Sequence, residues 1–265
     1  MANPVWRYAE VLSVALLLVY ALVNGLPSPR WVVPTALAVL LANAAQRLPA
    51  DLHAGQFGWQ VLQPGVTGIE TWVGFKAGFA ISWAPLTAAA VLLAIRRRIG
   101  WRRRSGTTAA IAATLVAGYA VVRVVDVWLA LRPLQQQEVN DSGSSATLIT
   151  VGLAVLPPLA LGMTALALAA ALAEHGRRVA PAGAVLLAVI ALPYMDWSIG
   201  AVPLPLYAGD DTTLFAWGAL MPSPSMPQPV PALTAMLELT AYLLLVAGLT
   251  GSRHRSQAAT TEASS

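Results

Sequence analysis

We single out five ionisable residues inside long apolar stretches of the chain, because their side chains could carry protons, hold anions or pair with one another. These residues are Lys76, Arg123, Asp126, Asp196 and Glu238. A charge is costly inside a bilayer and normally faces the interior of a helix bundle or a water-filled cavity. An acid in an apolar setting can act as a proton donor, and a base can hold a phosphate or another anion. We therefore expect these residues to form a polar pocket.

A purely structural interpretation of the same charges stays open. Arg123 and Asp126 are three residues apart, so they can neutralise each other on one helical face. Lys76 and Asp196 lie near the ends of their apolar runs, where a side chain can reach water. Glu238 is the hardest to explain in this way, because it lies about two turns inside an apolar run.

Aromatic residues flank two of the acids. Trp128 follows Asp126, while Tyr194 and Trp197 lie on either side of Asp196. Such residues commonly anchor helices at the membrane interface. They could equally wall a pocket and bind an apolar or cationic group by stacking.

No metal or cofactor site is expected from the residue types. The chain has no cysteine, and its three histidines, His53, His175 and His254, fall in or beside expected loops or the tail. The helical H-E-x-x-H zinc motif and the G-x-S-x-G nucleophile elbow are both absent from the sequence. The sequence also shows no motif of a known family.

The composition is that of an integral membrane protein. Of the 265 residues, 57% are hydrophobic and 11% are charged, whereas soluble domains carry about 25% charged residues. The apolar residues occur in runs of about 17–25, which is the length that crosses a hydrocarbon core. Heavy use of Ala, Arg, Pro and Gly is typical of a bacterial protein.

The apolar runs predict an all-α, polytopic bundle of seven spans within residues 1–249, followed by a disordered cytoplasmic tail at 250–265. Segment 31–46 is short and contains Pro34, so an alternative has six spans, with this segment in the outer leaflet or re-entrant. The expected spans are 8–26, 31–46, 71–95, 107–131, 147–173, 181–200 and 231–249.

A cluster of arginines predicts which way the bundle lies in the bacterial cytoplasmic membrane. Basic residues beside spans mark the cytoplasmic side, and two other basic groups, at 177–178 and 253–255, fall on the same side if the helices alternate. The C-terminus is then cytoplasmic and the N-terminus outside. The five intramembrane charges all lie roughly 6–12 Å below the outer surface. The cluster consists of Arg96, Arg97, Arg98, Arg102, Arg103 and Arg104.

The arginine cluster also indicates a partner. A short basic loop between membrane helices suits contact with anionic lipid head groups and is poorly suited to nucleic acid. Gly74 and Gly78 have the spacing that lets two helices approach closely, which would hold Lys76 against a neighbouring helix.

Three function classes fit these features. The first is a transporter or permease-like subunit with an outward-facing polar pocket. The second is a non-catalytic accessory or assembly subunit, and the third is a membrane enzyme that uses Asp196 or Glu238 as an acid on a lipid-soluble substrate. No loop on the basic side exceeds about a dozen residues, so an ATP-driven role would need a partner membrane or ATPase subunit.

Overall fold

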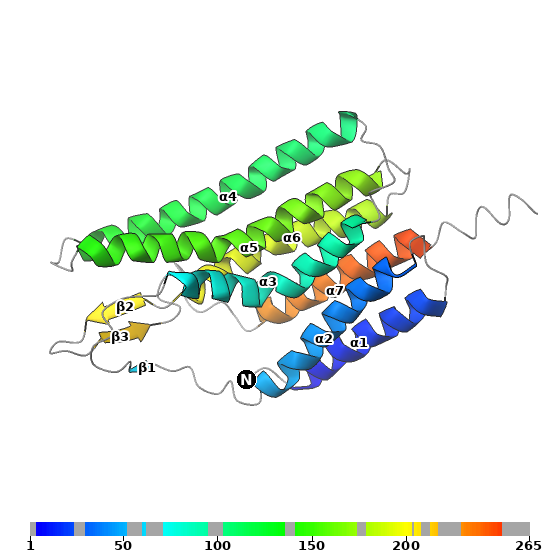
Figure 1. Cartoon of the computed structure of the whole chain (residues 1–265), viewed down its shortest axis with the longest axis horizontal. Coiled ribbons are helices and arrows are strands. Elements are labelled where there is room, and N and C mark those ends of the chain that lie inside the picture. The colour runs from blue at the N-terminus through cyan, green and yellow to red at the C-terminus, as the bar shows by residue number, and fades with distance from the viewer. Residues whose placement is uncertain are drawn as a thin grey trace, which may run out of the picture.

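The described part of the chain folds into seven helices and three short strands. The computed structural model describes residues 4–23, 30–51, 60–61, 71–94, 103–135, 141–173, 179–202, 204–207, 213–216 and 229–250. The helices, drawn in Figure 1, are α1 (Pro4–Val23), α2 (Val32–Asp51), α3 (Trp72–Leu93), α4 (Arg103–Gln135), α5 (Asp141–Ala173), α6 (Val179–Gly200) and α7 (Pro229–Thr250).

Consecutive helices run in alternating directions (Figure 1). The N-terminal ends of α1, α3, α5 and α7 lie toward the end of the bundle that carries the strands, called here the sheet end. The opposite end carries the start of α4, which begins inside the arginine cluster at Arg103 rather than after it. Residues 96–98 and 102 of that cluster lie outside the described residues, as do the basic groups at 177–178 and 253–255 and the tail at 251–265.

Among the helices that the structure describes, five are long and apolar enough to cross a membrane. Their apolar stretches are Trp72–Leu93, Thr107–Ala130, Ala146–Ala173, Val179–Gly200 and Leu233–Thr250. The apolar parts of α1 and α2 are shorter, Tyr8–Val23 and Val32–Gln46. At about 1.5 Å per residue they cover about 22–24 Å, less than a typical hydrocarbon core. The helical bundle is thus confirmed, whereas the choice between seven and six spans stays a prediction.

Helix α5 lies at the centre of the bundle and packs on α3, α4 and α6, while α6 also packs on α7. The core contains Leu161 of α5, Leu187 and Ile190 of α6 and Leu245 of α7, all fully buried. Helix α5 contains Pro157 and Pro158 and changes direction along its length (Figure 1), as expected where proline removes backbone hydrogen bonds.

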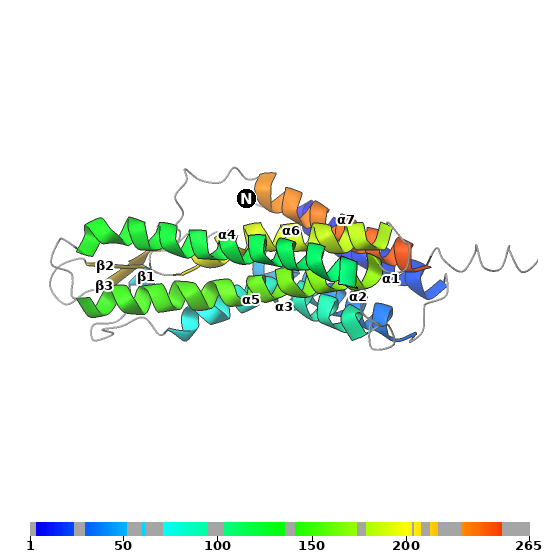
Figure 2. The ribbon, with the colours of Figure 1, turned by 90° about the horizontal axis from the view of Figure 1, so that it is seen from above.

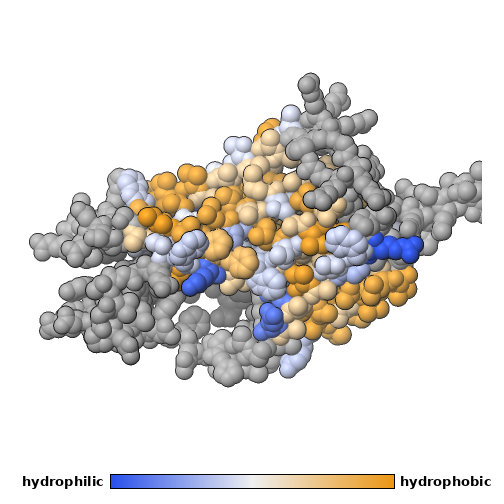
Figure 3. Space-filling model, viewed as in Figure 1, coloured by the Kyte–Doolittle hydropathy of each residue, from blue (hydrophilic) through white to orange (hydrophobic). Residues whose placement is uncertain are grey.

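Helix α4 lies at the edge of the bundle, alongside α5 (Figure 2). Its outward face is apolar, with Ile111, Leu115, Val121, Val122 and Leu129 all exposed. The surface of the helices is largely hydrophobic on the face shown in Figure 3. An apolar surface of this extent is compatible with insertion of the bundle into a membrane.

Glycines set the closest helix contacts. A Cβ atom at Gly74 would lie 1.9 Å from the carbonyl oxygen of Thr150, and one at Gly78 would lie 2.0 Å from that of Ala154. The close approach predicted from the spacing of these glycines is therefore present, and α5 is the partner of α3. Gly183 of α6 makes a similar contact with Ala241 of α7.

A small antiparallel sheet, which the all-α prediction did not include, lies at one end of the bundle (Figure 1). Its strands are β1 (Gln60–Val61), β2 (Leu204–Tyr207) and β3 (Thr213–Ala216), in the order β1-β3-β2. Phe215 pairs with both Gln60 and Pro205. The strands are too short for an alternating pattern to be visible in the sequence, and their pairing depends on two segments about 150 residues apart.

Candidate functional site

Arg123 of α4 and Asp196 of α6 form an ion pair between helices. The Nε atom of Arg123 donates to Oδ1 of Asp196 over 2.6 Å, and the two side chains are only 17% and 13% exposed. The hydroxyl of Tyr119 donates to the other carboxylate oxygen, Oδ2, over 2.9 Å. Both oxygens of Asp196 are therefore occupied by groups from α4.

The pair of Arg123 with Asp126 that the sequence predicts is present but weaker. It spans 3.4 Å, and the side chain of Asp126 is 45% exposed. Asp196 is thus the main partner of Arg123. Tyr119, Arg123, Asp126 and Asp196 are called here the ionic cluster. The sequence analysis did not identify Tyr119 as a site residue, although its position one turn before Arg123 places it on the same helical face.

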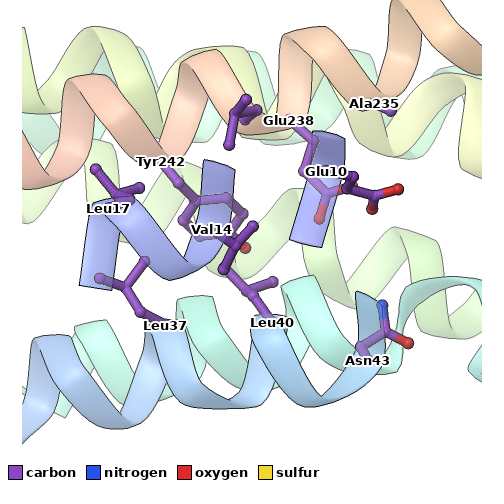
Figure 4. A pocket seen from close by; sticks show the side chains of 10 residues that line it. Glu10, Val14, Leu17, Leu37, Leu40, Asn43, Ala235, Glu238 and Tyr242 are labelled. Atoms are coloured by element: carbon purple, nitrogen blue, oxygen red, sulfur yellow. The ribbon is translucent and has the colours of Figure 1, made fainter. Parts of the chain in front are cut away.

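A second polar site, called here the acidic pocket, lies between α1, α2 and α7. Figure 4 shows Glu10, Glu238 and Asn43 toward one end of this pocket and Leu17 and Leu37 toward the other. Its volume of about 20 Å³ has room for one or two water molecules. The lining residues are Glu10, Val14, Leu17, Leu37, Leu40, Asn43, Ala235, Glu238, Leu239 and Tyr242.

Two buried tyrosines position the wall of the acidic pocket. The hydroxyl of Tyr194 on α6 donates a short hydrogen bond to Oε2 of Glu238 on α7. The hydroxyl of Tyr242 donates to the carbonyl oxygen of Pro85 on α3 over 3.2 Å. These bonds tie α7 to α6 and to α3, and the first one fixes the Glu238 carboxylate at the pocket.

Helix α6 contributes residues that contact both polar sites. Tyr194 contacts Glu238, while Asp196, two residues later, belongs to the ionic cluster. The ring of Trp197 packs against that of Tyr194, with centroids 5.5 Å apart and planes tilted by 34°. Of the three aromatic residues expected to wall a pocket, Tyr194 contacts Glu238 of the acidic pocket and Trp197 packs on Tyr194, but neither is among the residues that line this pocket. Trp128 lies on α4 and is partly exposed.

The five intramembrane charges that the sequence places at one depth are divided between different places. Arg123, Asp126 and Asp196 form the ionic cluster, and Glu238 lines the acidic pocket. Lys76 is exposed on α3 and is not among the residues that line this pocket. The arrangement therefore consists of two polar sites joined through α6.

Sequence reasoning missed three residues of the acidic pocket. Glu10 lies inside the first expected span and was a recognisable signal, since it is an acid within an apolar run. Asn43 lies near the end of the second expected span, and its burial could not be read from the sequence. Tyr242 is one turn after Glu238 on α7, which is a weaker signal.

The described residues contain no group of three or more His, Asp or Glu side chains that could hold a metal ion. Comparisons with protein-family models, curated proteins and solved structures find no match to the chain. The described fold is a helical bundle with a small sheet at one end. Five of its helices could span a membrane, which is compatible with a multi-pass membrane protein.

Proposed function

We propose that the chain is a transporter or a permease-like subunit of the bacterial cytoplasmic membrane, with a polar pocket that opens outward. The observation that carries the proposal is the acidic pocket. Glu10 and Glu238 come from the first and last helices of the bundle and line one pocket beside apolar side chains. Acids in such a position are expensive to maintain and mark solute or ion pathways.

The position of the acidic pocket supports the outward direction. Glu10 lies six residues from the start of α1, and Glu238 lies nine residues from the start of α7. Both helices start toward the sheet end (Figure 1), whereas the arginine-rich segment joins α3 to α4 at the opposite end. With the arginines on the cytoplasmic side, the pocket lies in the outer half of the bundle, about 9–14 Å along each helix.

The ionic cluster fits a supporting role in such a protein. Asp196 accepts hydrogen bonds at both of its oxygens from Arg123 and Tyr119. It is therefore badly placed to give a proton to a lipid-soluble substrate. Glu238 is the better candidate for an acid that acts on a bound species, since it lines the acidic pocket.

Transport is tested with purified protein in liposomes on a solid-supported membrane. Charge movement is recorded as the outer solution is exchanged for amino acids, organic acids, sugars, phosphate or monovalent salts. We expect one class of solute to give a current that is lost in Glu238→Gln and retained in Asp126→Asn, with both variants present at wild-type levels. Absence of current with every solute would contradict a stand-alone transporter.

A non-catalytic accessory subunit is the second candidate, and the exposed apolar face of α4 favours it. Ile111, Leu115 and Val122 of this face are all more than half exposed, so the face is available to lipid or to another membrane helix. Mild solubilisation of the native membrane followed by purification distinguishes the candidates. A membrane or ATPase subunit recovered in fixed ratio with the chain would favour the accessory role.

A further inference from the structure

We infer that the hairpin of α1 and α2 is the moving wall of the acidic pocket. The pocket opens when α1 separates from α7, while α3, α5, α6 and α7 stay together as one unit, called here the core unit. This inference deepens the proposed function and rests on it for its role, because a transport cycle needs a pocket that opens and closes. The movement itself is a property of the bundle and can be measured without any flux.

The pocket in this structure is too small for an organic solute. It has room for one or two water molecules, whereas sites that enclose an organic molecule are much larger. One wall must therefore move before such a solute can reach Glu238. The wall from α7 consists of Ala235, Glu238, Leu239 and Tyr242, and the wall from α1 and α2 consists of Glu10, Val14, Leu17, Leu37, Leu40 and Asn43.

Glycine contacts hold the α7 wall to the core unit. A Cβ atom at Gly183 of α6 would lie 2.5 Å from the carbonyl oxygen of Ala241, and one at Gly248 of α7 would lie 2.5 Å from the backbone nitrogen of Ala180. The backbones of α6 and α7 therefore approach closely at two levels, about two turns apart along α7. Similar contacts join α3 to α5. Helices packed this closely cannot slide past each other without clashes.

Hydrogen bonds add to these backbone contacts. Tyr194 of α6 donates to Glu238 of α7, and Tyr242 of α7 donates to the carbonyl oxygen of Pro85 on α3. Helix α7 is thus tied to two other helices of the core unit, and α5 packs on both of them. The α7 wall should therefore stay in place when the pocket opens.

Helices α1 and α2 are held in a different way. Neither contains a glycine, so their contacts are made through side chains. Apart from Glu10 and Asn43, the side chains that they place at the pocket are aliphatic (Figure 4). Aliphatic contacts have no preferred direction, and helices packed through them can slide over one another in shear movements. These aliphatic residues are Val14, Leu17, Leu37 and Leu40.

The contacts of the hairpin indicate where it opens. It meets the core unit at two places, where α2 packs on α3 and where α1 packs on α7, and α1 packs more extensively on α2 than on α7. The pocket lies at the contact of α1 with α7. Helix α1 should therefore move together with α2, with the contact between α2 and α3 as the hinge.

The movement is tested by double electron–electron resonance on the full chain in lipid nanodiscs. The chain has no cysteine, so spin labels can be attached to introduced cysteines alone. The test pair is Tyr8→Cys on α1 with Leu233→Cys on α7, and the matched control is Ile149→Cys on α5 with the same Leu233→Cys. All three residues are more than half exposed. We expect two distances that differ by about 5 Å or more for the test pair and one narrow distance for the control.

A third pair tests whether the hairpin moves as a unit. Tyr8→Cys on α1 with Gln46→Cys on α2 joins two exposed positions of the hairpin, and it should give one narrow distance. A labelled variant that does not fold is replaced by amide hydrogen exchange of the unaltered chain. There α1 should exchange faster than α6 and α7, and equal protection of the three helices would contradict the inference.

Two results of the resonance experiment would overturn the inference. They are a single narrow distance for Tyr8 with Leu233, both with and without solute, and equally broad distances for the test pair and the control. Movement of α1 in a chain that gives no current with any solute would contradict the proposed function alone. A current from a chain in which the distance between Tyr8 and Leu233 stays single and narrow would contradict this inference alone.

Discussion

The guanidinium of Arg123 on α4 contacts the carboxylate of Asp196 on α6 over 2.6 Å, and both side chains are largely buried. Helix α4 otherwise lies at the edge of the bundle, and few residues of its apolar stretch are buried. This ion pair, together with the hydrogen bond from Tyr119 to Asp196, forms a polar connection between α4 and α6.

Arg123→Gln should destabilise the protein by about 3 kcal/mol, since it leaves the largely buried carboxylate of Asp196 without its cation. The measurement is the thermal unfolding midpoint in detergent, followed by tryptophan fluorescence. Asp126→Asn is the control, and because Asp126 is 45% exposed it should cost about 1 kcal/mol or less. The double variant Arg123→Gln/Asp196→Asn should recover part of the loss. Equal effects of the two single variants would argue against the pair.

Tyr194→Phe should cost about 1–3 kcal/mol, because the carboxylate of Glu238 loses a donor in a mostly apolar setting. Tyr242→Phe is the matched control, since its hydroxyl donates to a neutral carbonyl, that of Pro85, and its loss should cost about 1 kcal/mol. Chemical denaturation in mixed micelles gives both free energies of unfolding. A Tyr194→Phe variant as stable as the wild type would mean that the bond contributes little.

Gly74→Ala should prevent correct packing of α3 on α5, because the new Cβ would lie 1.9 Å from the backbone oxygen of Thr150. Gly118→Ala is the opposite case. Apart from the neighbouring backbone of α4 itself, no atom lies within 4 Å of a Cβ built there, and alanine favours a helix over glycine by about 1 kcal/mol. We expect Gly74→Ala to lower the monodisperse yield strongly and Gly118→Ala to keep or raise it. Similar yields for both variants would contradict the contact between α3 and α5.

The arginine cluster should determine the topology. A fluorescent reporter that matures only in the cytoplasm should be active when fused at Gly100, and a periplasmic phosphatase should be inactive there. Changing Arg96, Arg97, Arg98, Arg102, Arg103 and Arg104 to glutamine should give mixed or inverted orientation in the same assay. Phosphatase activity at Gly100 of the unaltered chain would place the acidic pocket in the inner half of the bundle.

The N-terminus distinguishes seven spans from six. With seven spans and the arginine cluster inside, a tag at the N-terminus lies outside and is accessible to protease in intact spheroplasts. With six spans, in which segment 31–46 does not cross, the same tag is protected. The tag at the C-terminus, expected inside in both cases, is the control for the integrity of the membrane.

The sequence by itself determined the helices and their approximate ends. A run of apolar residues forms a helix of predictable length wherever it lies, because in lipid each helix must satisfy its own backbone hydrogen bonds. The spacing of Gly74 and Gly78 likewise predicted a close contact. The glycines could not indicate that α5 would be the neighbour, since a small-residue face accepts any helix of suitable shape.

Only the tertiary structure decided which charges meet. Counting residues along each helix gives the depth of a side chain, and by depth alone Arg123, Asp196 and Glu238 belong to one layer. Depth leaves open the direction in which a side chain points around the helix and the helix it faces. Packing of α6 between its neighbours fixes both. It directs Asp196 to Arg123 and Tyr194 to Glu238, and packing of α1 on both α2 and α7 brings Glu10 and Asn43 to the pocket that Glu238 lines.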